Sequence, residues 1–400
     1  MSTIVIVGAG QAGGWVAKGL RDKSFDGTIV LLGEESHPPH ERPPLSKAVL
    51  LGEADAASCQ LFPADFAASD RIDFRPGVRV TAIDRAAKRV RCADATEIAY
   101  DKLVIATGGR VRTLDLPGAE RALYLRTIED SAAIGARLAA AKHAVVIGGG
   151  WIGLEVAAAA RKRGVAVSVI EPLERVCARG LPPEASEMLA ALHREHGVDL
   201  RLGRGVRAIE ADRVMLDDGT SVPADVVVAG VGLIPNVELA RAAGLEVANG
   251  VVVDEHGRTN DPDIYAAGDV TFHPNRLLGR SLRLESWANA QNQGVAIAAA
   301  LTGATEGYAE QPWFWSDQYD VNLQILGAPA QWSAPIVRGD AAARRCSLFY
   351  LRDEKLDAVI AVNSPRDVTV ARRLMQRAIK LSAAELADPN IKLDALLKRN

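Results

Sequence analysis

The stretch IVIVGAGQAG, residues 4–13, decides the fold, and a second stretch of the same design, AVVIGGGWIG, follows at residues 144–153. Each joins an apolar run typical of a buried strand to a G-x-G-x-x-G loop and then to a helical pattern. The glycines allow a tight turn and let backbone amides approach a pyrophosphate at the helix N-terminus. One such loop alone could be an ordinary strand-to-helix connection, but two copies predict two dinucleotide sites, with these glycines in contact with the nucleotides: Gly8, Gly10, Gly13, Gly148, Gly150 and Gly153.

An acidic residue ends the next apolar run after each loop. Glu34 follows residues 28–32, and Glu171 follows residues 166–170. A carboxylate at this position accepts hydrogen bonds from an adenosine ribose and repels a phosphate on that ribose. We therefore expect the second site to prefer NADH to NADPH. Either glutamate could instead end a strand at the surface, and Arg175 and Arg179 downstream leave NADPH binding open.

Length and composition indicate a large globular enzyme. The 400 residues suggest two or three domains, and a hydrophobic content of 48% is sufficient for their cores. No apolar run reaches the roughly 18 residues of a membrane span, and the first strand begins too early for a signal peptide. We expect a cytoplasmic protein without a membrane contact. The net charge of −3 gives no reason to expect a nucleic-acid partner.

The four cysteines exclude one branch of redox chemistry. They lie far apart in the sequence, with no C-x-x-C pair near either glycine loop. A flavoenzyme that reduces a disulfide needs a thiol pair beside its flavin, so we do not expect that activity. No cluster of Cys and His has metal-ligand spacing either, so we expect no metal in this chain. These cysteines are Cys59, Cys92, Cys177 and Cys346.

Hydrophobic patterns outline the organisation of the chain. A first nucleotide unit runs to about residue 110 and includes an inserted antiparallel sheet near residues 78–80 and 88–92. A second unit follows and ends with the apolar strand at 226–230. The last part, from about residue 312, has alternating strands near 345–351 and 358–362 and a final basic helix. The remaining expected elements are a buried strand at 103–109 that ends in glycines, short strands around 251–253 and 264–267, and a helix at about 288–301.

Six motifs carry a resemblance to a known family: RPPLSK at 42–47, YLRTIED at 124–130, the second loop through residue 155, GVGLIPN at 230–236, AGD at 267–269 and PWFWSDQY at 312–319. Over nearly its whole length the chain resembles the FAD-dependent NADH:ferredoxin reductases that serve oxygenases, the putidaredoxin reductase and biphenyl dioxygenase ferredoxin reductase family. The resemblance implies an α/β fold of the glutathione-reductase superfamily, with two Rossmann-like domains and an α+β C-terminal domain. The implied domains are 1–111 with 233–311 for FAD, 112–232 for NADH and 312–400 as an interface domain.

The same resemblance implies the cofactor contacts. Arg42 could instead cap strand ends, Asp269 could be a helix N-cap, and Trp287 and Trp315 could be core aromatics instead of shielding the flavin. The residues expected at FAD, besides the first loop, are Ala12, Glu34, Arg42, Lys47, Val80, Ala106, Thr107, Gly108, Arg126, Asp269, Trp287 and Trp315, and those expected at NADH are the second loop with Ile152, Glu155 and Glu171.

Lys47 and Glu155 are the expected catalytic residues. By resemblance Lys47 lies at the reactive edge of the flavin, where its charge would favour the anionic reduced form. Glu155, one turn into the second Rossmann helix, would face the nicotinamide and pair with Lys47. Glu155 could instead be an exposed helix residue, but its neighbours Leu154 and Val156 are apolar. We therefore expect a buried, paired carboxylate.

The implied reaction is transfer of a hydride from NADH to FAD and of single electrons to a [2Fe-2S] ferredoxin. That ferredoxin would supply a Rieske dioxygenase or a cytochrome P450 in aromatic hydrocarbon catabolism. An NADH oxidase of the same superfamily is one alternative, but NADH oxidases and coenzyme A disulfide reductases carry a cysteine near the position of Arg42, and residues 37–42 of this chain contain none. A membrane quinone reductase would need a lipid-facing C-terminal segment, and the tail at 396–400 is short and polar. An apoptosis-factor-like sensor of NADH is the non-enzymatic alternative and would oxidise NADH slowly.

A basic face near the C-terminus is the expected docking site for the ferredoxin. Residues 331–400 contain 13 Lys and Arg against 8 Asp and Glu, a balance of +5. Within them, Arg373, Arg377 and Lys380 follow at i, i+4 and i+7 of a helix expected to begin near Asp367. A basic face would speed the encounter with an acidic ferredoxin. The alternative is a solvated helix face without a partner.

Overall fold

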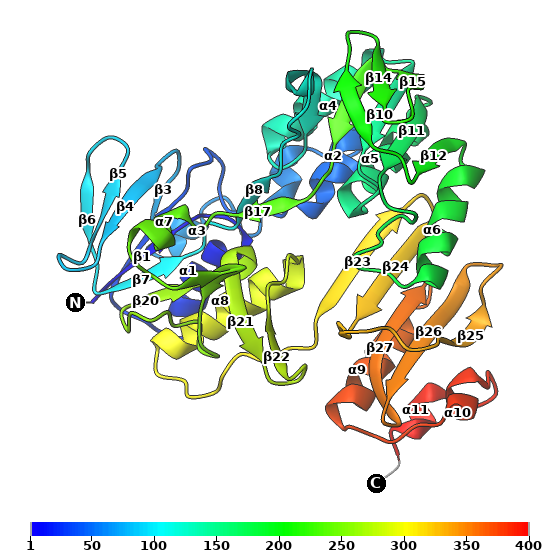
Figure 1. The fold of residues 1–400 in the computed structure, drawn as a ribbon. Helices are drawn as coiled ribbons and strands as arrows, with labels where there is room; N and C mark the ends of the chain where they lie inside the picture. Colours follow the sequence, from blue (N-terminus) through cyan, green and yellow to red (C-terminus); the bar gives the residue numbers. More distant parts are fainter. Residues whose placement is uncertain (1, 399–400) are drawn as a thin grey trace. The chain divides into compact units, whose positions relative to one another are not determined.

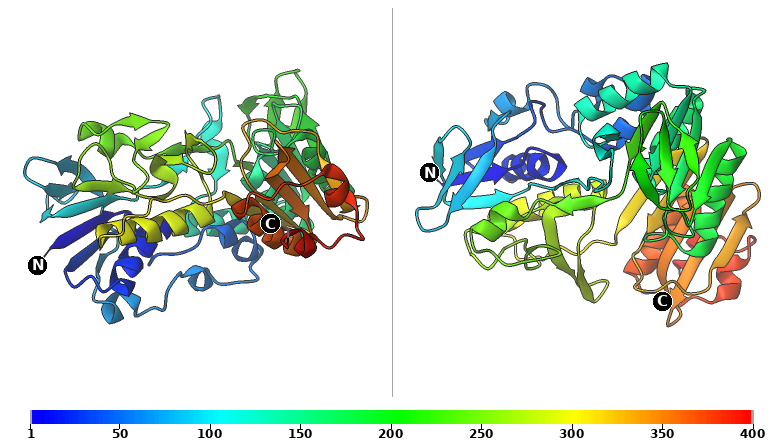
Figure 2. Two further views of the ribbon diagram at one scale, coloured as in Figure 1. Left: turned by 90° about the horizontal axis from the view of Figure 1, so that it is seen from below. Right: turned by 45° about the horizontal axis from the view of Figure 1, so that its top comes forward.

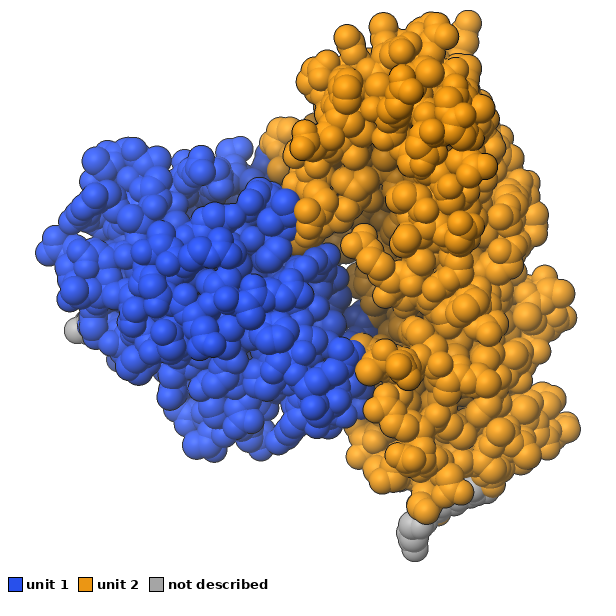
Figure 3. Space-filling view, in the orientation of Figure 1, with its two compact units in different colours: residues 1–41, 59–110, 234–313 blue, residues 42–58, 111–233, 314–400 orange. Residues whose placement is uncertain are grey.

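The computed structural model describes residues 2–398, and the chain forms two compact units (Figures 1 and 3). Unit 1 contains residues 1–41, 59–110 and 234–313, and unit 2 contains residues 42–58, 111–233 and 314–400. The expected domain boundaries fall near these breaks, except that residues 42–58 pack with unit 2. Strands β8 (Gly109–Val111) and β17 (Leu233–Pro235) lie where the chain passes from one unit to the other.

A five-stranded parallel sheet forms the centre of unit 1, in the order β20-β7-β1-β2-β3. Alternate residues of β1 enter two cores: Ile4 and Ile6 pack on one face, Val5 and Val7 on the other. Because both faces are covered, the strand reads as a continuous apolar run. The strands are β1 (Thr3–Val7), β2 (Thr28–Leu32), β3 (Asp73–Arg75), β7 (Lys102–Ile105) and β20 (Ile264–Ala266).

Helices α1 (Gln11–Asp22) and α8 (Trp287–Leu301) pack side by side on one face of this sheet (Figures 1 and 2). Small residues let them approach closely, since a Cβ on Gly294 would lie 2.7 Å from the carbonyl oxygen of Ala12. The expected inserted sheet is confirmed as β4 (Val80–Asp84), β5 (Arg89–Cys92) and β6 (Glu97–Ala99), all antiparallel. Unit 1 also contains α3 (Phe66–Ser69), α7 (Glu238–Ala242), β18 (Val247–Ala248), β19 (Gly250–Val252), β21 (Thr271–Asn275) and β22 (Arg280–Leu282).

Unit 2 repeats the design with a second parallel sheet, in the order β12-β11-β10-β16-β9. Its helices include α5, which begins directly after the second glycine loop, and α2, which belongs to the segment 42–58 and contacts α4 and α5. The strands are β9 (Ala122–Tyr124), β10 (His143–Ile147), β11 (Ala166–Glu171), β12 (Val198–Leu202) and β16 (Val226–Ala229), beside a small sheet of β13 (Val206–Ile209), β14 (Arg213–Leu216) and β15 (Ser221–Pro223); the helices are α2 (Ala48–Leu51), α4 (Ile128–Ala140), α5 (Trp151–Lys162) and α6 (Pro183–Glu195).

The C-terminal part of unit 2 is a third, five-stranded sheet in the order β23-β24-β27-β26-β25, in which the last four strands are antiparallel neighbours. Helix α9 packs against β27 and β24. The elements are β23 (Trp313–Gln318), β24 (Val321–Leu326), β25 (Ile336–Asp340), β26 (Arg345–Arg352), β27 (Lys355–Val362), α9 (Pro365–Gln376), α10 (Ala383–Ala387) and α11 (Leu393–Leu396).

The expected basic helix face is wrong in its extent. Helix α9 begins at Pro365 and ends at Gln376, so Arg377 is its C-cap and Lys380 lies beyond it. Ala378 adopts the left-handed φ of +50°, and the chain then turns so that Leu381 is buried and its amide donates to Glu354 O at 2.7 Å. Burial of Leu381 in the sheet is incompatible with continuation of the helix. Lys380 lies in this extended segment, 3.1 Å from the carboxylate of Glu354.

Among residues 2–398 no helix is both long and apolar enough to cross a membrane. The expectation of a cytoplasmic location stays a prediction.

The two glycine loops have nearly the same backbone geometry. Gly8 and Gly148 adopt φ values of +110° and +105°, which favour glycine. A Cβ on Gly13 would lie 1.9 Å from the carbonyl oxygen of Gly8, and a Cβ on Gly153 would lie 2.0 Å from that of Gly148. The close approach of helix and loop therefore requires a glycine at position 13 for the first loop and at position 153 for the second.

The glycines of the second loop should differ in their importance for stability. Gly153→Ala forces a Cβ against backbone, which should lower stability by about 1–3 kcal/mol despite the better helix propensity of alanine. The matched variant Gly150→Ala introduces a Cβ whose nearest neighbour is Gly230 O at 3.9 Å. Its melting temperature should stay close to that of the wild type. Equal melting temperatures for the two variants would contradict the packing argument.

Candidate functional site

The first glycine loop has space for a phosphate at its middle glycine. Among the described residues, no heavy atom lies within 4 Å of a Cβ built on Gly10. The side-chain amide of Gln11 is buried next to it, yet neither Nε2 nor Oε1 has a hydrogen-bond partner within residues 2–398. Because buried amides are nearly always hydrogen-bonded, this side chain fits a bound nucleotide at the start of α1.

The strand ends beside this loop are also arranged around it. Glu34 follows β2 and is exposed, with Arg79 Nε 3.6 Å from its carboxylate, so it is accessible to a ribose. The segment Ala106-Thr107-Gly108 follows β7. Asn236 holds this segment, because its Nδ2 donates to Thr107 O at 2.9 Å and its backbone N donates to Gly108 O at 3.0 Å. The motif that ends in Asn236 is thereby explained as a clamp on the neighbouring turn.

The second glycine loop carries its acidic residue in a fixed position. Glu171 is buried, and its carboxylate accepts hydrogen bonds from the amide of Gly149 at 2.7 Å and from that of Leu173 at 2.9 Å. Arg175 is committed elsewhere, since its guanidinium donates to Leu181 O at 2.9 Å and to Ala178 O at 3.3 Å. Arg179 is exposed. A negative group therefore faces the loop, and one of the two cations that could favour a ribose phosphate is already occupied.

The expected pair of Lys47 and Glu155 is present in unit 2. Glu155 lies in α5 with 4% of its surface exposed, and Lys47 Nζ is 2.7 Å from its Oε2. Ser46 donates to the same oxygen, and Ser316 Oγ donates to Oε1 at 2.6 Å. Burying a carboxylate is costly unless donors and a cation compensate it, and here each oxygen has its own partners.

Local sequence explains how Lys47 reaches Glu155. Pro43 and Pro44 begin a short 3-10 helix, Pro43–Ser46, because proline fixes the backbone angle of a first helical turn. Leu45 anchors this turn, since it is 1% exposed and its carbonyl accepts a hydrogen bond from Ser131 Oγ at 2.7 Å. The turn leaves Ser46 and Lys47 at its end, directed at α5.

Arg42 and Arg126 meet at the start of α4. Arg42 donates through Nη1 to the carbonyl oxygen of Arg126. Asp130 accepts from the amides of Arg126 and Thr127 at 2.9 and 2.8 Å and completes a capping box with Thr127. Arg42 therefore contacts the backbone just before α4, two residues beyond the end of β9, and its expected contact with a pyrophosphate stays a prediction.

The other expected residues lie in separate elements. Asp269 is the middle residue of a 3-10 turn, Gly268–Val270, whose N-cap is Ala267, so the N-cap alternative for Asp269 is wrong. Trp287 is the first residue of α8, and Val80 begins β4 and is buried. Trp315 Nε1 donates to Asp317 at 3.1 Å.

Ser46 and Ser316 were not among the predicted site residues. Both stand inside motifs that signalled the site, but a hydroxyl gives no pattern of its own. A buried glutamate predicted in α5 could have prompted a search for donors in these motifs.

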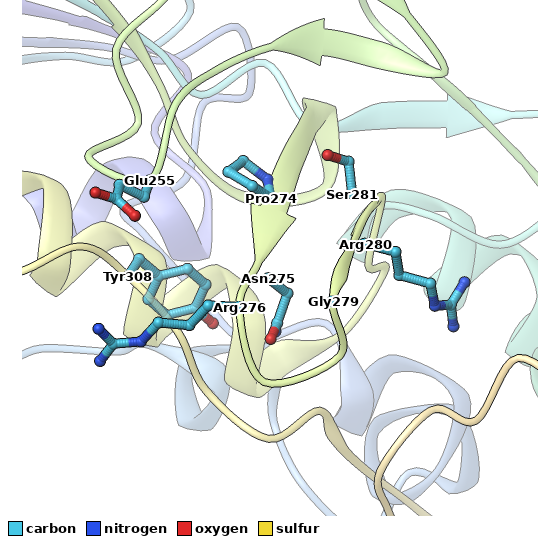
Figure 4. A pocket seen from close by; sticks show the side chains of 8 residues that line it. All are labelled: Glu255, Pro274, Asn275, Arg276, Gly279, Arg280, Ser281 and Tyr308. Carbon is cyan, nitrogen blue, oxygen red and sulfur yellow. The ribbon is translucent and has the colours of Figure 1, made fainter.

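The cysteines and a hollow in unit 1 contribute nothing to this arrangement. All four cysteines are buried, and none forms a disulfide within residues 2–398. In the same part of the chain no group of three or more His, Cys, Asp and Glu could hold a metal ion. A hollow of about 260 Å³ lies in unit 1 beside the turn from β21 to β22, between Tyr308 and Arg280 (Figure 4). None of the predicted site residues lines it.

Comparison with known proteins agrees with these features. Residues 2–294 match the family "Pyridine nucleotide-disulphide oxidoreductase", and residues 313–397 match "Reductase C-terminal". The chain is 46% identical to the ferredoxin–NAD(+) reductase component of the anthranilate 1,2-dioxygenase system of Burkholderia cepacia, over 98% of each chain. It is 42% identical to putidaredoxin reductase of Pseudomonas putida, over 98% of this chain and 96% of that protein.

A solved structure of the covalent complex of putidaredoxin reductase with putidaredoxin superposes with a TM-score of 0.96 and 41% identity, covering 99% of this chain and 98% of that one. The predicted fold class, with two Rossmann-like domains and a C-terminal domain, is confirmed. This chain belongs to the pyridine nucleotide-disulphide oxidoreductase family and carries the reductase-type C-terminal domain.

Proposed function

We propose that this chain is an NADH-dependent ferredoxin reductase that contains FAD and supplies electrons to an oxygenase through a [2Fe-2S] ferredoxin. The observation that carries the proposal is the pair of Lys47 with the buried carboxylate of Glu155, in a chain with two nucleotide loops and without a cysteine pair. When bound, FAD accepts two electrons from NADH and can release them singly to a one-electron carrier. The relative from Burkholderia cepacia is the ferredoxin–NAD(+) reductase component of a dioxygenase system, and the relative from Pseudomonas putida is a putidaredoxin reductase, which supports the same reaction here.

The residues of unit 1 would hold the FAD. We infer that Gly8, Gly10 and Gly13 present backbone amides to its pyrophosphate and that Gln11 uses its unsatisfied amide there. Glu34 would accept from the adenosine ribose, and Asp269 from ribityl hydroxyls. The division into an FAD domain (1–111 and 233–311), an NADH domain (112–232) and a C-terminal domain (312–400) remains part of this proposal.

The second loop would hold NADH, with Glu171 at the ribose. Glu155 and Lys47 would lie at the reacting rings, where the lysine compensates negative charge that arrives with the electrons. Glu155 would orient the nicotinamide carboxamide and hold Lys47 in place. The two tryptophans, Trp287 and Trp315, would exclude water from the reacting edge.

The proposal is tested by adding NADH, the FAD-loaded protein and a panel of [2Fe-2S] ferredoxins to cytochrome c. Rapid NADH-dependent reduction of cytochrome c with at least one ferredoxin, and little without it, is the expected result. Slow NADH oxidation with every ferredoxin would instead favour a sensor of NADH.

NADH should be preferred to NADPH by about a hundredfold or more in kcat/KM, because Glu171 stands where a ribose phosphate would need a cation. Glu171→Gln removes the negative charge and should reduce that preference. Steady-state turnover with ferricyanide measures both values. Similar efficiency of the wild type with the two nucleotides would refute the assignment of Glu171.

Glu155→Gln should slow reduction of the flavin by NADH and leave FAD bound. Loss of one contact that matters in the transition state typically costs about tenfold to a thousandfold in rate. Stopped-flow bleaching of the flavin measures this rate. The control is Glu187→Gln, which changes an exposed glutamate of α6 paired with Arg194. If both variants bleach at the wild-type rate, Glu155 has only a structural role.

We further propose that the ferredoxin docks on a basic surface that includes Arg373 of α9. Two of the three expected cations are engaged within the chain: Arg377 donates to Leu397 O at 2.8 Å, and Lys380 pairs with Glu354. Arg373 is exposed on the last turn of α9. The excess of positive charge in this region would accelerate association with an acidic partner more than it would increase final affinity.

Ferredoxin reduction should therefore fall steeply once ionic strength passes about 0.1 M, where the Debye length is about 10 Å, while ferricyanide reduction changes little. Arg373→Glu should slow association with the ferredoxin about fivefold or more at low salt. Arg207→Glu, the same charge change at an exposed position of β13, is the matched control. Equal association rates for the two variants would locate the docking surface elsewhere.

A further inference from the structure

Beyond Ser316, the hydrogen bonds of Glu155 continue into the protein. Ser316 Oγ accepts from Gln318 Nε2 at 3.0 Å, and Gln318 Oε1 lies 2.7 Å from His193 Nε2. The three residues are at most 2% exposed. They come from β23 and α6, so one continuous chain of polar groups connects the C-terminal sheet and a helix of the nucleotide-binding part to the carboxylate.

The carboxylate fixes the direction of every bond in this chain. A carboxylate only accepts, so the Ser316 hydroxyl must donate its single hydrogen to Glu155. The serine oxygen then accepts from the amide nitrogen of Gln318. The amide oxygen of Gln318 must in turn accept, which requires a proton on His193 Nε2. In all three hydrogen bonds the donor therefore points toward Glu155. The donor and the acceptor of each bond are fixed by the bond before it.

His193 enters this chain as a neutral ring. Burial lowers its pKa to about 4, against an opposing effect of the bond to Gln318. With Nε2 protonated, Nδ1 is an acceptor and faces the hydroxyl of Tyr319 at 3.5 Å. Tyr319 is itself held by stacking on His196, with ring centroids 3.6 Å apart. The far end of the chain is therefore fixed in position.

Strand alternation places Ser316 and Gln318 on the face of β23 opposite to Trp315. Ser316 and Gln318 are two residues apart and lie on the buried face, whereas Trp315 and Asp317 are bonded to each other on the opposite face. The two faces thus have different tasks. On the buried face, Ser316 bonds to Glu155 and Gln318 bonds to His193.

We propose that Ser316, Gln318 and His193 are positioning residues that hold the carboxylate of Glu155 in its reactive orientation. The proposal rests on the function proposed above and adds residues of β23 and α6 to the nucleotide-reacting site. Lys47 and Ser46 restrain Oε2 of Glu155. The hydrogen bonds that run from His193 through Gln318 and Ser316 restrain Oε1. Without this chain of hydrogen bonds, the carboxylate could rotate about its last side-chain bond and still keep its ion pair with Lys47.

The test compares the limiting rate of flavin reduction with the apparent dissociation constant for NADH, both from stopped-flow bleaching. Ser316→Ala and Gln318→Leu should lower the limiting rate about three- to thirtyfold, since orientation and one donor are lost. The apparent dissociation constant should change less than about twofold. FAD content and melting temperature show whether each variant is folded.

Ser347→Ala is the matched control, because Ser347 is a buried serine of the same sheet that donates to the carboxylate of Asp367 at 2.8 Å. It should reduce its flavin at the wild-type rate. Ser316→Thr keeps the hydroxyl and should recover most of the rate. His193→Gln keeps a donor toward Gln318 and should be faster than His193→Leu.

Two failures can be distinguished. If the wild type itself is not reduced by NADH, the proposed function is wrong. If the wild type is reduced but Ser316→Ala is as fast as Ser347→Ala, or if Ser316→Thr is as slow as Ser316→Ala, the positioning role alone is overturned. Should Gln318→Leu fail to fold, the comparison of Ser316→Ala with Ser347→Ala still decides, because each of these two variants removes one oxygen atom only.

Discussion

One buried carboxylate constrains the architecture of unit 2. Glu155 is 4% exposed, and an uncompensated carboxylate at such a position would cost several kcal/mol. Its donors come from two segments far from α5 in the sequence, the proline-led turn at 43–47 and strand β23. This need explains why residues 42–58, which follow the first Rossmann strands in the sequence, pack with unit 2. The site is therefore complete only when both segments are in place.

The glycine loops impose a second constraint, which acts on the backbone. Gly13 and Gly153 each bring a helix to within van der Waals contact of the loop before it, and no side chain fits between. The middle glycines are different, because Gly10 has open space around its Cβ position among the described residues. Packing therefore explains two glycines of each loop, whereas it does not explain the third, where a bound nucleotide would fit. Gln11, with its unsatisfied amide, indicates a ligand at the same place.

The sequence predicted what depends on neighbours along the chain. Apolar runs predicted β2 with its observed ends, and the apolar neighbours of Glu155 indicated a buried, paired carboxylate. The sequence did not predict Ser316 as a donor to Glu155, because Ser316 and Glu155 are 161 positions apart and a hydroxyl has no sequence signature. The end of α9 was also missed, since helical spacing at Arg373 and Arg377 continues in the sequence while burial of Leu381 ends the helix in space.

The neutrality of the polar chain behind Glu155 follows from the same electrostatics. The carboxylate of the ion pair between Lys47 and Glu155 is already buried in this region. A positive charge on His193 would need a negative partner, and among the described residues no carboxylate lies within hydrogen-bond distance of its ring. Burial keeps the imidazole uncharged, with its pKa lowered to about 4. Aligned dipoles of the hydroxyl, the amide and the ring can then stabilise a negative carboxylate without the desolvation cost of another ion. The negative charge of Glu155 is thus stabilised by the aligned dipoles of Ser316, Gln318 and His193.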